Sequence, residues 1–463
     1  MKTKQIAILL CGLCFIISLT FFSSHQSSSM RMPAKAVMPK HYIYLIHGIM
    51  GSQGHFEKMK EALEQHLPEF DSAFEHKIFY FNYDTGNDEL STYDFARQFF
   101  KYLDQTIPKD ETDYKISLVM HSQGGLVGAI WLYRSFVKDA QFSSDKVNHL
   151  DAFITLGTPF WGAKTAVMGS LINRVLENPS VLPYGEKEIN EMSFLSDTIY
   201  NFRQGIIHNN NFSNYLKSNV RMLNIAAVAQ AMNFLNIFST GKNVYEDDSA
   251  VILPSARFDF FYQEVLADHY PNEEIIPAYT TKKIELAPFL IVDAVHLTPK
   301  SLINKLPSVV QIPSNCVEDA LCDHPTFSYI LKHLANVPFQ INNNEIHKKL
   351  TSFFLELNIR LEAVHKNIKL SDFQIEYSPK VKELVSIDSK TELYSKGEFQ
   401  SQENPHHYRF YKTGDITSNQ IDDQQIVVVT IKLNGYKSKI IEIYVSKGQS
   451  SYIDVLLEKN LNL

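Results

Sequence analysis

The residue best suited to act as a nucleophile is Ser122, within the motif His-Ser-Gln-Gly-Gly at residues 121–125. The motif follows an apolar run at 116–120, which predicts a buried strand, and it opens a helical pattern. A tight strand-to-helix turn holds a serine in a strained backbone position and presents its hydroxyl to a substrate. Residues two positions from the serine must be small; Gly124 is, whereas Met120 stands where glycine is usual. The motif predicts nucleophilic catalysis, and Met120 leaves open a helix start without catalysis.

A second loop could stabilise the negative charge that develops when a serine attacks a carbonyl group. Residues 47–51, His-Gly-Ile-Met-Gly, directly follow a predicted buried strand at 42–46. In such an arrangement, one backbone N–H of this loop and the N–H of the residue after the nucleophile point at the oxyanion. We expect these two donors to be the backbone N–H groups of Ile49 and Gln123.

Three short strings of sequence together resemble the bacterial lipase and GPI inositol-deacylase-like branch of the α/β-hydrolases. They are Leu-Ile-His-Gly at 45–48, His-Ser-Gln-Gly-Gly at 121–125 and Leu-Gly-Thr-Pro-Phe-Trp-Gly at 156–162. The resemblance covers roughly residues 40–338. It implies an α/β-hydrolase fold, hydrolysis of ester bonds in lipid-like or other acyl substrates, and neither a metal nor an organic cofactor.

The catalytic acid is expected to follow the nucleophile in the chain, and the histidine is expected to come last. Residues 246–256 resemble the family's Asp-Gly-Val-Val segment followed by Ser-Ala, and aligning Pro-Ser-Ala at 254–256 places Asp248 at the acid. Ser249 stands where the family usually has glycine. Asp247 is the alternative acid, and either aspartate could instead be a helix cap or a solvated turn residue.

Two histidines compete for the role of general base. His296 ends the apolar run 289–295, so it is expected just past a late buried strand. His324 opens a predicted helix at 326–334 and would serve if the last strand were 309–312. We predict His296 as the base and keep His324 as the alternative.

The pattern over residues 40–338 predicts the scaffold that positions these loops. Short strands that are apolar on both faces alternate with helices, which is typical of a mostly parallel sheet covered by helices. Residues 163–219 interrupt this rhythm with helical patterns, and we expect a cap or lid there; a peripheral helical insertion is the alternative. From 343 to 463 the pattern has period two, as in 355–362, which predicts a C-terminal antiparallel β-sandwich.

Residues 1–29 have the composition of an export signal. Two lysines precede the apolar run 6–22, and a serine-rich stretch follows it. We expect an exported protein, periplasmic or secreted, with a cleaved signal. An uncleaved membrane anchor is the alternative, because the run is at the lower limit for spanning a bilayer. In an exported protein, Cys316 and Cys322 are expected to form a disulfide.

These expectations combine into one functional hypothesis. The net charge of −7 argues against nucleic acid as a partner, and we see no His/Cys/Asp cluster with the spacing of a zinc site. We expect an exported lipase, phospholipase or esterase whose triad is Ser122, Asp248 and His296, with a lipid or other acyl ester as its substrate and contact to a membrane surface through the cap. The alternatives are an acyltransferase with the same triad, and a catalytically silent hydrolase fold that binds a lipid or carbohydrate.

Overall fold

The structure is a computed structural model. It describes residues 38–49, 51–163, 186–229, 246–266, 275–298, 302–303, 305–362, 368–387, 398–417 and 424–460. The predicted export signal at 1–29 and part of the predicted cap, 164–185, lie outside the described residues. Residues Pro39–Leu463 form one compact unit. In the part of the chain that is described, no helix has the length and apolar character needed to cross a membrane.

The first sheet has six strands, all parallel, in the order β2-β1-β3-β4-β5-β9. The strands are β1 (Lys40–Ile46), β2 (Glu75–Phe81), β3 (Tyr114–His121), β4 (Leu150–Leu156), β5 (Arg221–Ala227) and β9 (Phe289–Val292). The central strands are buried along nearly their whole length, as expected for strands that are apolar on both faces. The predicted parallel sheet is confirmed.

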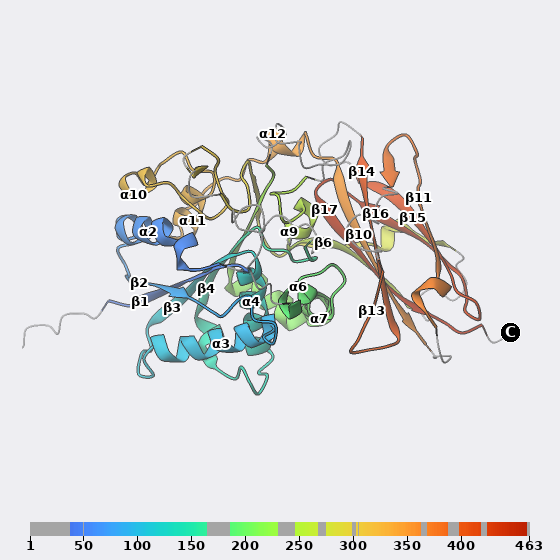
Figure 1. The fold of residues 1–463 in the computed structure, drawn as a ribbon, viewed down its shortest axis with the longest axis horizontal. Helices are drawn as coiled ribbons and strands as arrows, with labels where there is room; N and C mark the ends of the chain where they lie inside the picture. Colours follow the sequence, from blue (N-terminus) through green and yellow to red (C-terminus); the bar gives the residue numbers. More distant parts are fainter. Residues whose placement is uncertain are drawn as a thin grey trace, which may run out of the picture. The chain divides into compact units, whose positions relative to one another are not determined.

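Helices cover both faces of this sheet. The main ones are α2 (Glu57–Phe70), α3 (Thr92–Thr106), α4 (Gln123–Phe136) and α11 (Phe327–Leu334). The apolar sides of α3 and α4 share one core with the sheet, and those of α2 and α11 share the other core, on the opposite face (Figure 1). Helix α3 begins where the sequence provides a capping box, because Ser91 accepts from the N–H of Asp94 and the Asp94 carboxylate accepts from the N–H of Ser91.

The predicted insertion is helical where it is described. It contains α6 (Glu186–Glu191), α7 (Asp197–His208) and α8 (Asn210–Asn219). Helix α7 approaches α4 closely at Gly205, where an added Cβ would lie 2.4 Å from the ring of Tyr133. The other short helices are α9 (Leu253–Ala256), α10 (Asn315–Glu318) and α12 (Asn344–His347).

Two further sheets pack face to face as a sandwich. The larger contains β12 (Val385–Ile387), β14 (His407–Ile416), β10 (Ser352–Leu361), β17 (Gln449–Leu457), β6 (Phe260–Val265) and β8 (Lys282–Ile284) in that order, with β13 (Glu398–Gln400) beside β14. The smaller contains β11 (Gln374–Pro379), β15 (Gln425–Lys432), β16 (Lys439–Val445) and β7 (Ile275–Ile276). Apolar side chains of both sheets form one shared core. The predicted C-terminal sandwich is confirmed as a β domain.

The sandwich differs from the expectation in two respects. Its sheets are mixed and not antiparallel, because β17 pairs in parallel with both β10 and β6, and β7 pairs in parallel with β16. It also recruits β6, β7 and β8 from residues 260–284, within the range assigned to the hydrolase domain. Partners this distant in sequence are set by packing of the whole unit and leave no short-range turn signal.

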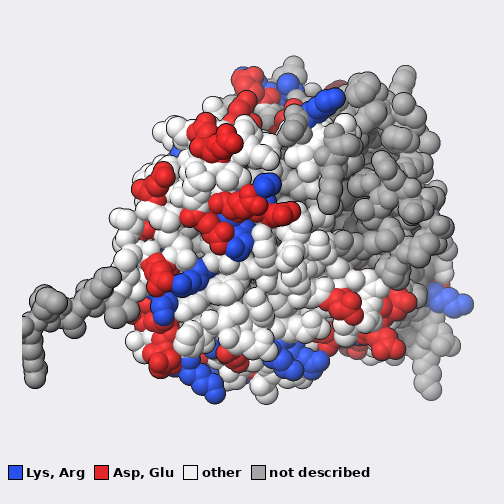
Figure 2. Space-filling view, turned by 60° about the vertical axis from the view of Figure 1, so that its left-hand side comes forward, with Lys and Arg blue, Asp and Glu red and all other residues white. Residues whose placement is uncertain are grey.

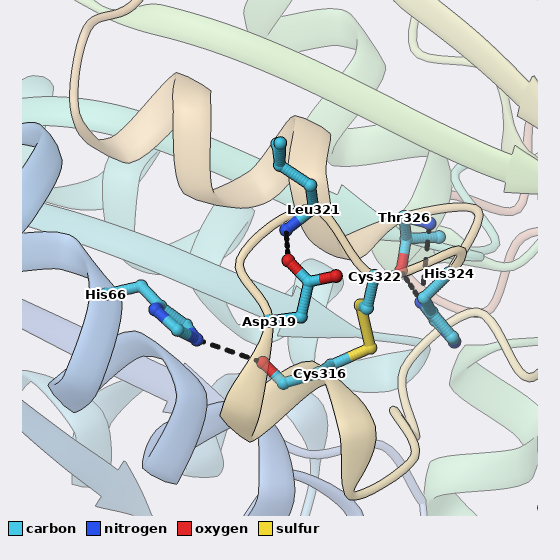
Figure 3. The surroundings of a disulfide bond; sticks show 7 residues. All are labelled: His66, Cys316, Asp319, Leu321, Cys322, His324 and Thr326. Carbon is cyan, nitrogen blue, oxygen red and sulfur yellow. Dashed lines mark hydrogen bonds between the residues drawn. A yellow bond between two sulfur atoms is a disulfide. The ribbon is translucent and has the colours of Figure 1, made fainter.

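The disulfide between Cys316 and Cys322 is present and confirms the predicted pairing (Figure 3). The carbonyl oxygen of Cys316 lies 3.2 Å from His66 Nε2 of α2, so this loop is joined to the helix. His324 lies directly beside the disulfide, with its Nδ1 3.2 Å from Thr326 Oγ1 (Figure 3).

The surface of the molecule carries charges of both signs. On the face shown in Figure 2, acidic and basic side chains are interspersed.

Candidate active site

Ser122 lies at a sharp turn between β3 and α4. Its backbone has φ 55° and ψ −126°, a region that non-glycine residues rarely occupy. The turn is held by a hydrogen bond from the N–H of Ser122 to the carbonyl oxygen of Leu156, 2.9 Å away. A Cβ at Gly124 would lie 2.5 Å from the carbonyl oxygens of Ile46 and His47, so only glycine fits there. The predicted strained turn around Ser122 is therefore present.

Met120, the departure from the usual small residue, is accommodated by a glycine on the following helix. Met120 is fully buried. A Cβ at Gly128 of α4 would lie only 2.1 Å from Met120 Sδ, so the methionine occupies space that a side chain at 128 would take. The larger residue and the strained turn are therefore compatible.

Asp248 and His296 follow β5 and β9 along the chain and meet beyond the ends of these strands. His296 Nδ1 lies 2.7 Å from Asp248 Oδ2, and the backbone N–H of His296 donates to the carbonyl oxygen of Asp248, also at 2.7 Å. The other carboxylate oxygen accepts from the N–H groups of Ala250 and Val251 at 3.1 and 2.8 Å. Asp248 is 1% exposed and His296 6%. An aspartate held in this way can orient an imidazole and stabilise its charged form.

Asp247, the alternative acid, and His324, the alternative base, have different surroundings from those of Asp248 and His296. Asp247 Oδ1 accepts from the N–H of Ser249 at 2.9 Å, as in a local turn. His324 is buried beside the disulfide, and this burial lowers its pKa to about 4. Residues 309–312, the alternative last strand, are not part of the six-stranded sheet, whose edge strand is β9.

Gly157, just after β4, links the Asp–His pair to the serine turn. A Cβ at Gly157 would lie 2.8 Å from Asp248 Oδ2 and 3.0 Å from His296 Nδ1, and the residue has φ 56°. The preceding carbonyl group accepts the hydrogen bond from the N–H of Ser122. The ring of His121, next to the serine, has its centroid 4.5 Å from that of His296. Burial and the neighbouring His296 lower the pKa of His121 well below its usual value.

The loop after β1 reaches the nucleophile. A Cβ at Gly48 would lie 2.6 Å from Ser122 Cβ and 3.2 Å from Ser122 Oγ. Ile49 follows Gly48 and is buried, and Gln123 opens α4, where first-turn N–H groups have no intrahelical acceptor. The two predicted oxyanion donors are thus the residues directly after Gly48 and Ser122.

Sequence reasoning missed a buried carboxylate beside this turn. Glu188 of α6 is fully buried and accepts from Gln123 Nε2 at 2.8 Å, Thr85 Oγ1 at 2.9 Å and the N–H of Gly86 at 2.6 Å. Burial raises the pKa of Glu188, against the opposing effect of these hydrogen bonds. The Glu188 carboxylate therefore connects the insertion to the residue after the nucleophile. A glutamate in a polar helical segment gave no sequence signal for this role.

Comparison with known proteins agrees with this architecture. Residues 37–178 match the family described as "Putative serine esterase (DUF676)". The structure is similar to phospholipase PlaB from Legionella pneumophila, with a TM-score of 0.60 at 11% identity over 91% of this chain and 94% of that one. It is also similar to the same phospholipase in complex with thio-NAD, with a TM-score of 0.57 at 10% identity and the same coverage of both chains.

At these identities the structural likeness shows the fold. None of the curated protein sequences compared with this chain matches it significantly. The fold, the strained serine turn and the family match over the first third of the chain agree with the predicted resemblance. The chain has an α/β-hydrolase fold, and its residues 37–178 match the family described as a putative serine esterase.

Proposed function

We propose that this protein hydrolyses carboxylic ester bonds of lipid-like substrates, with Ser122 as nucleophile, His296 as general base and Asp248 as the acid. The observation that carries the proposal is the 2.7 Å contact between His296 Nδ1 and Asp248 Oδ2, with both residues packed on Gly157 beside the serine turn. This contact occupies Nδ1 of the imidazole and leaves Nε2 for the serine hydroxyl.

The proposed mechanism follows from these roles. His296 accepts the proton of the Ser122 hydroxyl, and the oxygen attacks the ester carbonyl group. The backbone N–H groups of Ile49 and Gln123 donate to the oxyanion that develops, an interaction worth about 3–4 kcal/mol for each donor in related sites. His296 then protonates the departing alcohol, and water hydrolyses the acyl-enzyme with the same histidine as base.

The substrate class rests on the family match and on the insertion. The similar fold of PlaB, a phospholipase, favours a lipid ester. Glu188 of α6 contacts the side chain of Gln123, which supports the proposal that residues 163–219 form a cap over the site. We include export in the proposal, on the basis of the signal-like composition of residues 1–29 and the disulfide. Contact of the cap with a membrane surface is part of the proposal because a lipid ester is the proposed substrate.

The experiment is covalent labelling with a fluorophosphonate probe, combined with a substrate panel of short-chain esters, triglycerides and phospholipids. The parent protein should be labelled and active, whereas Ser122→Ala should be unlabelled, inactive and folded. A folded Ser122→Ala variant with activity within a few-fold of the parent would refute the catalytic assignment. Ester products formed when an alcohol is added would favour the acyltransferase alternative, and an unlabelled parent would favour the silent lipid- or carbohydrate-binding fold.

A further inference from the structure

One face of the seven-stranded sheet, covered by α7, carries buried polar side chains among aromatic ones. Glu356 and Asn358 of β10 and Asp454 of β17 point to this face and are at most 1% exposed. Arg203 of α7 forms an ion pair with Glu356 here. The α7 helix therefore covers charged and amide side chains as well as aromatic ones, and each buried polar group needs a partner.

Two carboxylates lie side by side at the edge of this covered surface. Asp454 and Glu264 are register partners on the parallel strands β17 and β6, so their side chains lie on the same face. Like charges directly opposite each other on neighbouring strands are destabilising. A third group, the exposed His208 at the end of α7, has a ring nitrogen close to both, and the three ligand atoms lie within 4.8 Å of one another.

Asp454 is only half satisfied by the protein. Its Oδ1 accepts from Asn358 Nδ2 at 2.9 Å and from Arg360 Nε at 3.0 Å, both on β10. Its Oδ2 is buried and has no hydrogen-bond partner among the residues that the structure describes. A buried carboxylate oxygen without a donor is costly, and it calls for a partner such as a water molecule or a cation.

The arginines of this surface do not neutralise both Asp454 and Glu264. Arg203 pairs with Glu356 and Arg409 pairs with Asp197, which leaves Arg360 for Asp454. Glu264 has no ion pair within the described part of the chain. One negative charge therefore stays uncompensated next to an orphaned carboxylate oxygen.

We propose that His208, Glu264 and Asp454 bind a divalent transition-metal ion, with Zn²⁺ as the representative of this class. One imidazole and two carboxylates suit Zn²⁺, whereas Ca²⁺ and Mg²⁺ prefer an all-oxygen set. The ion supplies the missing partner of Asp454 Oδ2 and separates the two carboxylates. It also joins the end of α7 to β6 and β17, so it stabilises the insertion against the C-terminal sheet.

This site was invisible in the sequence, where no zinc site was expected. His208, Glu264 and Asp454 are far apart in the chain and belong to a helix and two strands. Zinc motifs are recognised by ligands close together in sequence, and here only the parallel pairing of β6 with β17 and the packing of α7 bring the ligands together.

The test is calorimetric titration of the full chain, freed of metals with EDTA, against Zn²⁺, with Ca²⁺ as the comparison ion. The parent should bind one more Zn²⁺ than His208→Ala, or bind it more tightly by about 100-fold, because loss of even an outer-shell partner costs about 10–100-fold in metal affinity. Zn²⁺ should raise the Tm of the parent and not that of His208→Ala. The matched control is His406→Ala, which removes an exposed histidine on the C-terminal part without affecting the site.

Glu264→Gln is the second variant, because it keeps the size of the side chain and removes only its charge. It should weaken Zn²⁺ binding as His208→Ala does. Absence of Zn²⁺ binding by the folded parent would overturn the proposal. So would equal Zn²⁺ affinity in the parent, His208→Ala and Glu264→Gln, since the metal would then lie elsewhere, for example at His296. Ca²⁺ binding that is tighter than Zn²⁺ binding and unchanged by His208→Ala would also overturn it.

Discussion

The two large sheets of this molecule differ in where the buried carboxylates beside them lie. In the parallel sheet of the hydrolase part, polar residues buried within strands, such as Ser117 and Asn224, carry no carboxylate, and the buried residues of the candidate site, Ser122, Asp248 and His296, lie beyond strand ends. In the seven-stranded sheet, buried polar residues such as Glu356 and Asn358 lie within a strand. Residues at the ends of parallel strands share one edge and can act on a common ligand, whereas residues within a strand face whatever layer covers the sheet.

Helix α7 explains why the period-two sequence pattern of β10 gives a wrong expectation of solvent exposure in the seven-stranded sheet. A period-two pattern such as that of β10 normally means one face in the core and one face in water. Here the polar face is covered by α7, whose Arg203 pairs with Glu356 and lies over the ring of Trp161 at 4.1 Å. Trp161 belongs to the segment after β4, and its ring also packs directly against Phe354 and Tyr452 of the sheet. The seven-stranded sheet is therefore in contact with residues next to the candidate site.

The largest expected effect concerns the strand ends of the hydrolase part. His296→Ala should lower kcat by about 10⁴-fold or more, because members of a triad act as a unit. His324→Ala should retain most of its kcat, since His324 lies beside the disulfide. Steady-state kinetics on folded variants measure the difference, and a reversed order would refute the assignment of the base.

The neighbouring aspartates provide the matched comparison for the acid. Asp248→Asn should lose far more activity than Asp247→Asn, because Asp248 contacts His296 Nδ1. Equal losses would mean that the contact is not used in catalysis.

The next effect concerns the charged face of the second sheet. Arg203→Met should lower the free energy of unfolding by about 3–5 kcal/mol, because it leaves the carboxylate of Glu356 buried without its partner. The double variant Arg203→Met with Glu356→Leu should recover most of this loss, since an apolar pair of similar volume removes both charges. Urea denaturation measures both values. A double variant as unstable as the single one would show that the surrounding polar groups, and not the charge pair, determine the cost.

A smaller effect tests how the serine turn tolerates Met120. Gly128→Ala should destabilise the protein by about 1–3 kcal/mol, because the added methyl group overlaps Met120 Sδ in a packed core. In a Met120→Ala background the same substitution should be neutral or stabilising, as alanine is preferred to glycine in a helix by about 1 kcal/mol. A double-mutant cycle measures the interaction energy between the substitutions at positions 120 and 128. Additive effects on the free energy of unfolding would contradict the proposed packing.

The smallest effect is expected at Ser249, which stands where the family usually has glycine. Its φ of 88° is unfavourable for a residue with a Cβ. Ser249→Gly should therefore raise the free energy of unfolding by up to about 1 kcal/mol. Thermal denaturation measures this, and a lower Tm would show that the serine side chain contributes more than the strain costs.

The amino-acid sequence by itself determined the local elements of the hydrolase part. The predicted strands at 42–46 and 116–120 lie within β1 and β3, because continuous apolar runs of this length are typical of buried strands in a parallel sheet. The serine turn was also predictable, since a glycine two residues after a serine between strand and helix is a local requirement of the backbone.

Only the tertiary structure decided which distant residues meet. The sequence favoured Asp248 over Asp247 only through an alignment with the family, and the contact of Asp248 with His296 depends on the position of His296 after β9. The sequence likewise carried no sign that β6 pairs with β17 or that Glu188 contacts Gln123. The physical reason is range: strand and helix periodicity reflects neighbours within a few residues, whereas register between distant strands and the cover over a sheet depend on packing of the complete chain.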